Sequence, residues 1–152
     1  RSLVESSPYD FVAVNNLATL LQERGDFEGA LAMAERLRWG HYGDKPLSGD
    51  RLPLEYLDTL GTVYRSKGQF RAAAELFDQA SKRYAKEPLV FLHLGRDYAG
   101  LKQYPLARVQ LNRAATLADE RAKEVTDAAE KAKYQALAAE ARNALKDLDR
   151  QP

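Results

Sequence analysis

The sequence predicts an all-α protein made of stacked helix–turn–helix units, and three observations lead to this fold class. One pattern of large and small residues occurs twice between residues 57 and 114, with matched positions 34 residues apart. Apolar residues elsewhere recur at i, i+3, i+4 and i+7, the spacing of one face of an α-helix. No segment shows the apolar–polar alternation of a half-buried strand, and the glycines lie between the periodic segments, where helices should end.

The repeated pattern consists of a large residue, a Leu-Gly pair, an aromatic residue and a series of small positions. The first copy is Leu57, Leu60-Gly61, Tyr64, Gly68, Phe70, Ala73, Phe77 and Ala80, and the second is Phe91, Leu94-Gly95, Tyr98, Tyr104, Ala107, Leu111 and Ala114. This order and period resemble the tetratricopeptide repeat, a helix–turn–helix unit that buries its faces only against neighbouring units.

Composition is that of a globular domain and excludes several chemistries. With 152 residues, 45% hydrophobic and 30% charged, the chain can form one domain with a core. It has no Cys, so disulfides, thiolate metal sites and Cys nucleophiles are excluded. A net charge of +1 supplies no field that collects phosphates, so nucleic acid is not an expected partner. No apolar run reaches the roughly 20 residues of a spanning helix, so we expect no membrane insertion. Because the chain starts at Arg1 without a methionine, we expect a piece of a longer protein.

The first unit is a weaker, third copy of the pattern. Ser7 and Pro8 suit a cap and a first helical position, so a helix is expected from about Pro8 to Arg24. Gly25-Asp26 ends this helix, and a second helix is expected over residues 28–38. Aligned on Gly25 and Gly68, the first copy lies nine residues further from the second than the period requires.

The extra residues predict a long insert loop over residues 39–53. Three Gly and two Pro in this stretch prevent a continuous helix, although one turn of helix can fit. Ordered loops of this length are uncommon and often functional. Trp39 and Tyr42 in the loop either pack against the apolar end of the first helix pair or contact a partner, and both interpretations stay open.

The later units and the tail follow in order. Unit two is expected to begin near Leu54 and unit three at Glu87-Pro88, and Pro105 opens the last repeat helix. Thr126-Asp127 with Glu130 resembles a capping box, which separates a final helix from the repeat helix that ends near Glu124. Its single apolar stripe is typical of a terminal capping helix. The expected organisation is one domain over 1–152, with repeats at about 8–38, 54–86 and 87–120 and a capping helix at about 127–149.

The resemblance implies a right-handed α-solenoid whose first helices line an inner groove that holds an extended peptide or a partner helix. The groove stripe should lie one residue beyond the packing stripe, because the packing positions are already committed. It comprises Asn15, Thr19 and Gln22, then Asp58, Thr62 and Arg65, then Leu92, Arg96 and Ala99. Each set has i, i+4, i+7 spacing, so one helix face carries it. Amides can donate to and accept from a peptide backbone, and Arg65 and Arg96 can hold carboxylates.

Residues for catalysis or metal binding are not grouped in the sequence. His41 lies in the loop and His93 in a repeat helix, where we expect a surface residue, and neither has a second His at ligand spacing. Charged residues of the last helices alternate in sign, which favours i, i+4 pairing within a helix. We therefore expect no enzyme activity, no cofactor and no metal.

The function predicted from the sequence is protein–protein interaction. The phrases Asn15-Asn16-Leu17-Ala18 and Leu57-Asp58-Thr59-Leu60-Gly61 resemble those of bacterial repeat arrays in envelope and scaffold systems, which implies part of a larger assembly protein. The family's clamp for acidic chaperone tails is not reproduced, since Asp58 and Thr62 replace its basic and amide residues. The alternative is a structural spacer or self-association through Phe11 and Leu3-Val4. The sequence leaves the compartment open between periplasm or cell envelope and cytoplasm.

Overall fold

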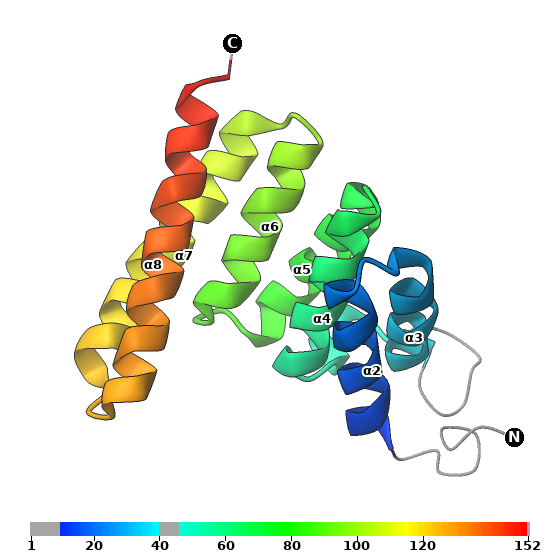
Figure 1. Cartoon of the computed structure of the whole chain (residues 1–152). Coiled ribbons are helices and arrows are strands. Elements are labelled where there is room, and N and C mark those ends of the chain that lie inside the picture. The colour runs from blue at the N-terminus through cyan, green and yellow to red at the C-terminus, as the bar shows by residue number, and fades with distance from the viewer. Residues whose placement is uncertain (1–9, 40–45, 152) are drawn as a thin grey trace, which may run out of the picture.

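A computed structural model describes residues 10–39 and 46–151 and shows a stack of helices (Figure 1). The described residues form seven α-helices and one short 3-10 helix. They are α2 (Phe11–Glu23), α3 (Phe27–Trp39), η1 (Gly49–Arg51), α4 (Leu54–Ser66), α5 (Phe70–Arg83), α6 (Pro88–Gly100), α7 (Tyr104–Glu124) and α8 (Ala128–Asp149). The predicted all-α fold of stacked helical repeats is confirmed.

The helices stack by one rule, used three times. Helix α4 packs against α2 and α3, α6 packs against α4 and α5, and α8 packs against α6 and α7. Each hairpin thus receives the next helix in the groove between its own two helices. As a result α2–α3 and α7–α8 lie at opposite ends of the stack (Figure 1). The core follows the same order, with one cluster under the first hairpins and a second under α6, α7 and α8.

The turns within the three hairpins share one hydrogen bond that closes each first helix. The backbone N–H of Asp26 donates to Leu21 at 2.9 Å, that of Gln69 to Tyr64 at 2.8 Å and that of Gln103 to Tyr98 at 2.9 Å. The first two turns use Gly25 and Gly68 at φ of 81° and 71°, and the third uses Lys102 at 61°. Glycine adopts this left-handed conformation without steric penalty, whereas Lys adopts it at a steric cost.

The predicted start of the first helix is wrong. Helix α2 begins at Phe11, three residues after Pro8, and its cap is Asp10, whose Oδ1 accepts from the backbone N–H of Ala13 at 3.1 Å. The predicted cap Ser7 and Pro8 lie outside the described residues. The Asp10 side chain satisfies one of the free N–H groups of the first turn, which favours a helix that begins directly after Asp10.

The described part of the insert, residues 46–53, packs along α5. The backbone N–H of Gly49 donates to Gln79 Oε1 at 2.9 Å, and the Tyr84 hydroxyl donates to the carbonyl of Leu52 at 2.7 Å. A Cβ at position 49 would overlap the backbone carbonyl of Leu76, so the loop approaches α5 at a distance that only glycine allows.

Replacing Gly49 by Ala is therefore expected to lower the free energy of unfolding by about 1–3 kcal/mol, the usual range for overpacking. The clash is with backbone, which cannot rotate away as a side chain can. Urea unfolding monitored by circular dichroism measures the change. Arg51→Ala, in the same turn but exposed, is the matched control and should leave the midpoint unchanged. Equal midpoints for Gly49→Ala and the wild type would contradict this packing.

Candidate binding groove

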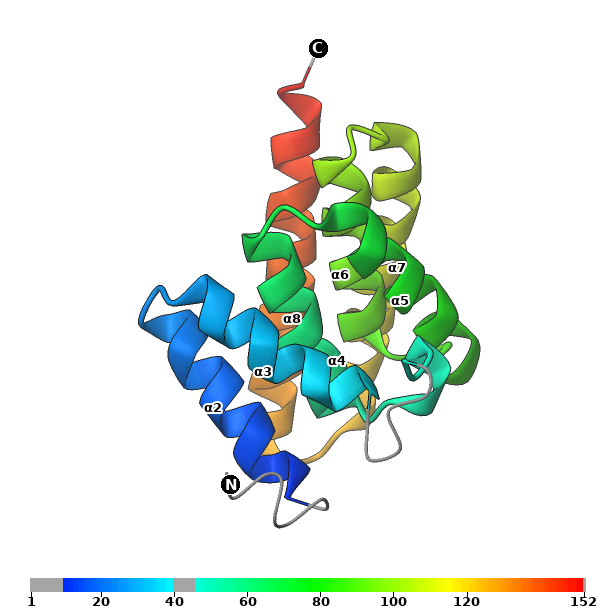
Figure 2. The ribbon, with the colours of Figure 1, turned by 90° about the vertical axis from the view of Figure 1, so that its right-hand side faces the viewer.

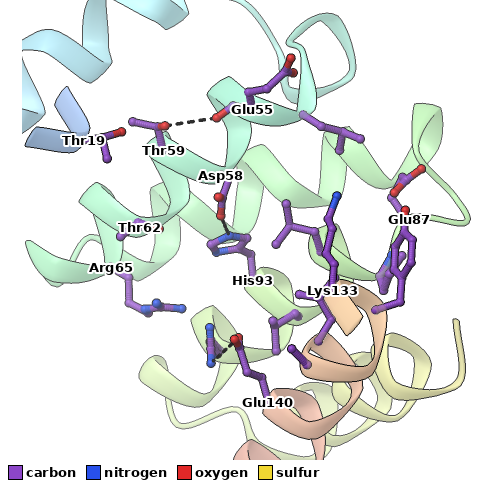
Figure 3. A pocket seen from close by; sticks show the side chains of 18 of the residues that line it. Thr19, Glu55, Asp58, Thr59, Thr62, Arg65, Glu87, His93, Lys133 and Glu140 are labelled. Carbon is purple, nitrogen blue, oxygen red and sulfur yellow. Dashed lines mark hydrogen bonds and ion pairs between the residues drawn. The ribbon is translucent and has the colours of Figure 1, made fainter. Parts of the chain in front are cut away.

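One cavity of about 910 Å³ runs across the first helices of all three hairpins and onto α8 (Figure 3). Its walls come from α2, α4, α6 and α8, the helices that occupy the same place in successive steps of the stack. The lining side chains are Asn15, Thr19, Leu54, Glu55, Asp58, Thr59, Thr62, Arg65, Glu87, Pro88, Leu89, Leu92, His93, Arg96, Lys133, Tyr134, Ala136, Leu137 and Glu140.

The structure brings the predicted groove residues together around this cavity, with the exception of Gln22 and Ala99. The amide of Gln22 donates to Ser66 Oγ at 2.5 Å, which ties α2 to the end of α4 instead of lining the cavity. Leu92 lines the cavity but is only 1% exposed, because it packs in the core cluster under α6 and α7. Ala99 lines a neighbouring cavity of about 630 Å³. A binding role for these residues remains a prediction.

The expectation that His93 is a surface residue is wrong. Its side chain is 2% exposed and its ring stacks on Phe77, with centroids 4.6 Å apart and planes 3° from parallel. Its Nε2–H donates to Asp58 Oδ1 at 2.7 Å, so His93 holds the single carboxylate of the predicted groove stripe in place (Figure 3). The sequence missed this because a polar residue inside a helix gives no signal of which side faces a neighbour.

The charge states of this pair follow from their surroundings. The hydrogen bond from His93 lowers the pKa of Asp58, with the desolvation of the half-buried carboxyl acting in the opposite direction. Burial lowers the pKa of His93, although Asp58 raises it. The pair is therefore a neutral imidazole and an ionised carboxylate, and because Asp58 only accepts, the proton of His93 lies on Nε2. The other ring nitrogen, Nδ1, is buried against Gly61 without a partner among the described residues.

A fully buried carboxyl, that of Asp97, lies one turn beyond His93 on α6. Asp97 is 0% exposed, and neither of its oxygens has a hydrogen-bond partner among the described residues. Burial raises its pKa to about 8, while Arg65 and Arg96 pull in the opposite direction. The repeat period places Asp97 where the second hairpin has Val63, which is 1% exposed. An acid thus occupies a position that is apolar in the second hairpin. The sequence pattern alone did not show that this acid is buried.

The basic side chains of the cavity are Lys133 and two arginines, Arg65 and Arg96. Arg65 Nη1 is buried and has no partner among the described residues. Burial, followed by the charge of Arg96, lowers the pKa of Arg65. Arg96 Nη2 lies 3.3 Å from Glu140 Oε2, and both side chains are partly exposed. Figure 3 shows Arg65 extending from α4 toward the side of the cavity where Glu140 lies.

The wall formed by α8 was not predicted. Lys133, Leu137 and Glu140 line the cavity, although the sequence gave these residues only a solvated or packing role. Among residues 10–39 and 46–151, no ion pair has the expected i, i+4 spacing within one helix. Most of the ion pairs join different helices, as the pair of Arg142 and Asp119 does. Only the docking of α8 against α6 turns its charged face toward the groove.

Of the two residues predicted as loop contacts, one lies at the end of a helix. Trp39 ends α3 and is 42% exposed, and Tyr42 lies outside the described residues. Phe11, expected to pair between copies, contacts Tyr56 within the chain at a centroid distance of 6.5 Å, and Leu3-Val4 lie outside the described residues. Within the described ranges, His, Asp and Glu side chains nowhere gather in threes as a metal ion would need. None of the described helices combines the length and apolar character that crossing a bilayer requires.

Comparison with known proteins identifies the two N-terminal hairpins. A family model described as tetratricopeptide repeat matches residues 12–37 and 54–87, which correspond to α2–α3 and α4–α5. The third hairpin, α6–α7, repeats the pattern of large and small residues one period later. Comparison with curated proteins finds no match.

Proposed function

Because the chain belongs to the tetratricopeptide repeat family, whose members generally mediate protein–protein interaction, we propose that it is a non-catalytic module that binds an extended peptide or a partner helix in the groove described above. The cavity provides the shape, since it is continuous over α2, α4, α6 and α8. A segment lying along it contacts every step of the stack, so affinity comes from many small contacts.

The observation that carries the proposal is a set of buried polar atoms on the cavity wall that have no partner among the described residues. They include Asn15 Oδ1 and Arg65 Nη1. A buried polar group without a hydrogen bond is destabilised by about 1–3 kcal/mol, and a charged group by more. A bound peptide offers both kinds of missing partner, backbone N–H groups for the amide of Asn15 and oxygens for Arg65.

The charges of the groove favour an acidic group near the centre of the ligand. Asp58 is engaged by His93, and Glu87 lies 3.1 Å from Arg121 Nη2. Arg65 has no ion pair among the described residues, and Arg96 makes one contact to Glu140 at 3.3 Å. A ligand carboxylate between the two guanidinium groups forms charge-assisted hydrogen bonds, which are about twice as strong as neutral ones.

The wider setting of the proposal rests on the resemblance of the first two repeats to bacterial arrays. On that basis the module belongs to a larger assembly or cell-envelope protein and presents a partner to it. Periplasm, envelope and cytoplasm are all compatible with a groove of this kind.

A peptide selected from a random library displayed on phage is expected to contain an acidic residue and to lose at least about tenfold in affinity on Arg65→Ala, since an interaction with a charged group contributes about 1.5–3 kcal/mol. Fluorescence polarisation measures the affinity. Replacing the peptide's acid by its amide should produce a similar loss, and no further loss in the Arg65→Ala variant.

The matched control is Arg71→Ala, an exposed arginine on α5 that lines neither cavity. Asp58 is left unchanged, because its loss would leave the buried His93 N–H unsatisfied and confuse binding with stability. Selected peptides that bind Arg65→Ala and Arg71→Ala with equal affinity would overturn the groove as the site.

A further inference from the structure

The carboxyl group of Asp97 lies beside the arginines of the groove and has no partner. Its side chain is 0% exposed, and neither oxygen has a hydrogen bond among the described residues. Arg65 Nη1, on the neighbouring helix α4, is buried and also lacks a partner there. Buried polar groups without hydrogen bonds are destabilised, and charged ones more than neutral ones. An acceptor and a donor that both lack partners therefore lie on adjacent helices.

The contact between α4 and α6 places Asp97 within reach of Arg65. Seen from the α2–α3 end in Figure 2, α4 lies in front of α6. The hydrogen bond between Asp58 and His93 fixes where the two helices meet. From there Asp97 lies four residues further along α6, about 6 Å, and Arg65 lies seven residues further along α4, about 10 Å. The two helices run in the same direction, since Arg65 lines the second cavity together with Gly100 at the end of α6.

Burial decides the charge of Asp97 in the empty groove. A carboxylate that is fully buried and accepts no hydrogen bond is strongly disfavoured, so the group keeps its proton. Burial accordingly raises the pKa of Asp97 to about 8, although the charges of Arg65 and Arg96 act to lower it. At neutral pH the carboxyl is therefore uncharged and makes no ion pair with Arg65.

The charged groups around this carboxyl come from the helices that pack against α6. Helix α4 contributes Arg65, together with Asp58, which is held by His93. Helix α8 contributes Glu140, which lies 3.3 Å from Arg96. The described charged side chains of α5 and α7 are not among those that act on the carboxyl. Arg65, which has no ion pair among the described residues, is thus the cation that an ionised carboxylate here would take.

We propose that Asp97 controls binding in the groove: while it holds its proton, Arg65 is free for the acidic group of the ligand, and when it ionises, it takes Arg65 for itself. This inference rests on the acidic ligand of the proposed function. The two carboxylates need the same N–H donors, so each disfavours the other. A ligand carboxylate at Arg65 also acts on Asp97 as a like charge, which keeps the proton on Asp97.

The affinity for an acidic ligand is therefore expected to be constant below about pH 8 and to fall above it. The empty groove loses the Asp97 proton near pH 8, whereas the occupied groove keeps it to a higher pH. Because the occupied state binds more protons in this range, the affinity falls by up to about tenfold for each pH unit. His93 does not contribute here, since burial lowers its pKa from the ordinary value of 6.5.

Carbon-13 magnetic resonance of the aspartate carboxyl groups tests the contact without any ligand. The titration midpoint of Asp97 is expected near pH 8 and should rise in Arg65→Gln, because a positive charge that lowers it is removed. Asp97→Asn identifies the signal. Glu120→Gln, an exposed acid on α7 that lines neither cavity, is the matched control and should leave the midpoint unchanged. A midpoint that ignores Arg65→Gln would contradict the proposal, because the two groups then do not meet.

Calorimetry measures the coupling to binding. The probe is an acidic peptide from the phage selection described above, acetylated at its N-terminus and free of His, Cys, Tyr and Lys, so that it does not titrate above neutral pH. Its dissociation constant for the wild type should rise by about 5–30-fold between about pH 7 and about pH 9.5. The constant should not change with pH in Asp97→Asn, and Glu120→Gln should keep the wild-type profile.

The outcomes separate this inference from the proposed function. A peptide that needs Arg65 but binds equally well at both pH values would sink the competition with Asp97 and leave the groove as the site. An equal loss of affinity at high pH in the wild type and in Asp97→Asn would also sink it, since another group would then be responsible. A peptide that binds without Arg65 overturns the proposed site itself, and this inference with it.

Discussion

Replacing Asp97 by Val is expected to raise the free energy of unfolding at neutral pH by on the order of 4 kcal/mol. Asp97 is 0% exposed, lacks a hydrogen-bond partner among the described residues and has its pKa raised to about 8 by burial. Val is the residue that the second hairpin uses at this position, where it is fully packed at Val63. The substitution therefore gives the third hairpin the apolar residue that the second hairpin has at the matching position.

The pH dependence of the difference identifies the cause. The folded state holds a proton on Asp97 up to about pH 8, whereas the unfolded chain releases it near pH 3.8. The folded state thus binds more protons between these values, so the contribution of Asp97 is fully present below pH 3.8 and is lost as the pH rises toward about 8. The gap between the Val variant and the wild type should widen by about 1.4 kcal/mol for each pH unit in this window.

Urea unfolding of both proteins across the window measures this gap. His93 has the opposite tendency, since its lowered pKa favours the folded state above its ordinary value, but it is present in both proteins and cancels in the comparison. Asp97→Asn removes the titration without the apolar gain and should flatten the pH profile alone. A gap that stays constant with pH would show that Asp97 is ionised in the folded protein and paired with Arg65 or Arg96.

Replacing Phe77 by Ala is expected to lower the free energy of unfolding by about 3–5 kcal/mol, the usual range for a buried aromatic residue. Phe77 is 0% exposed, and its ring fills the space above Gly61, where an added Cβ would come within 2.5 Å of it. The same ring stacks on His93. Loss of the ring thus leaves a cavity at the crossing of α4 and α5 and removes the cover of the imidazole.

Two readouts separate these consequences. Chemical denaturation gives the change in stability, and Phe77→Leu, which keeps most of the volume, should lose clearly less than Phe77→Ala. Nuclear magnetic resonance of the imidazole in the Ala variant should show the pKa of His93 rising, because burial is the main cause that lowers it. A stability loss below about 1 kcal/mol would mean that the crossing collapses to fill the space.

These residues show where sequence reasoning reached its limit. Gly61 and Phe77 were recognisable from the repeat, because both belong to the pattern of small and large residues that recurs after 34 residues. His93 and Asp97 were not, because a polar residue one helical turn from a packing position has no marker of its burial. Val63 lies one period before Asp97, and this match suggests that position 97 is buried. Whether it is buried depends on which helices cover it.

The 34-residue period and the residues that turn each hairpin were enough to predict the fold class and the repeat. The packing positions leave one face of each first helix free, which led to the predicted groove stripe. Which of those side chains are available depends on contacts between helices. The docking of α8 on α6 added a wall with Lys133 and Glu140, and the close approach of α4 to α6 tied Asp58 to His93. Helical periodicity fixes the face of a helix on which a residue lies, but what covers that face depends on helices far away in the sequence.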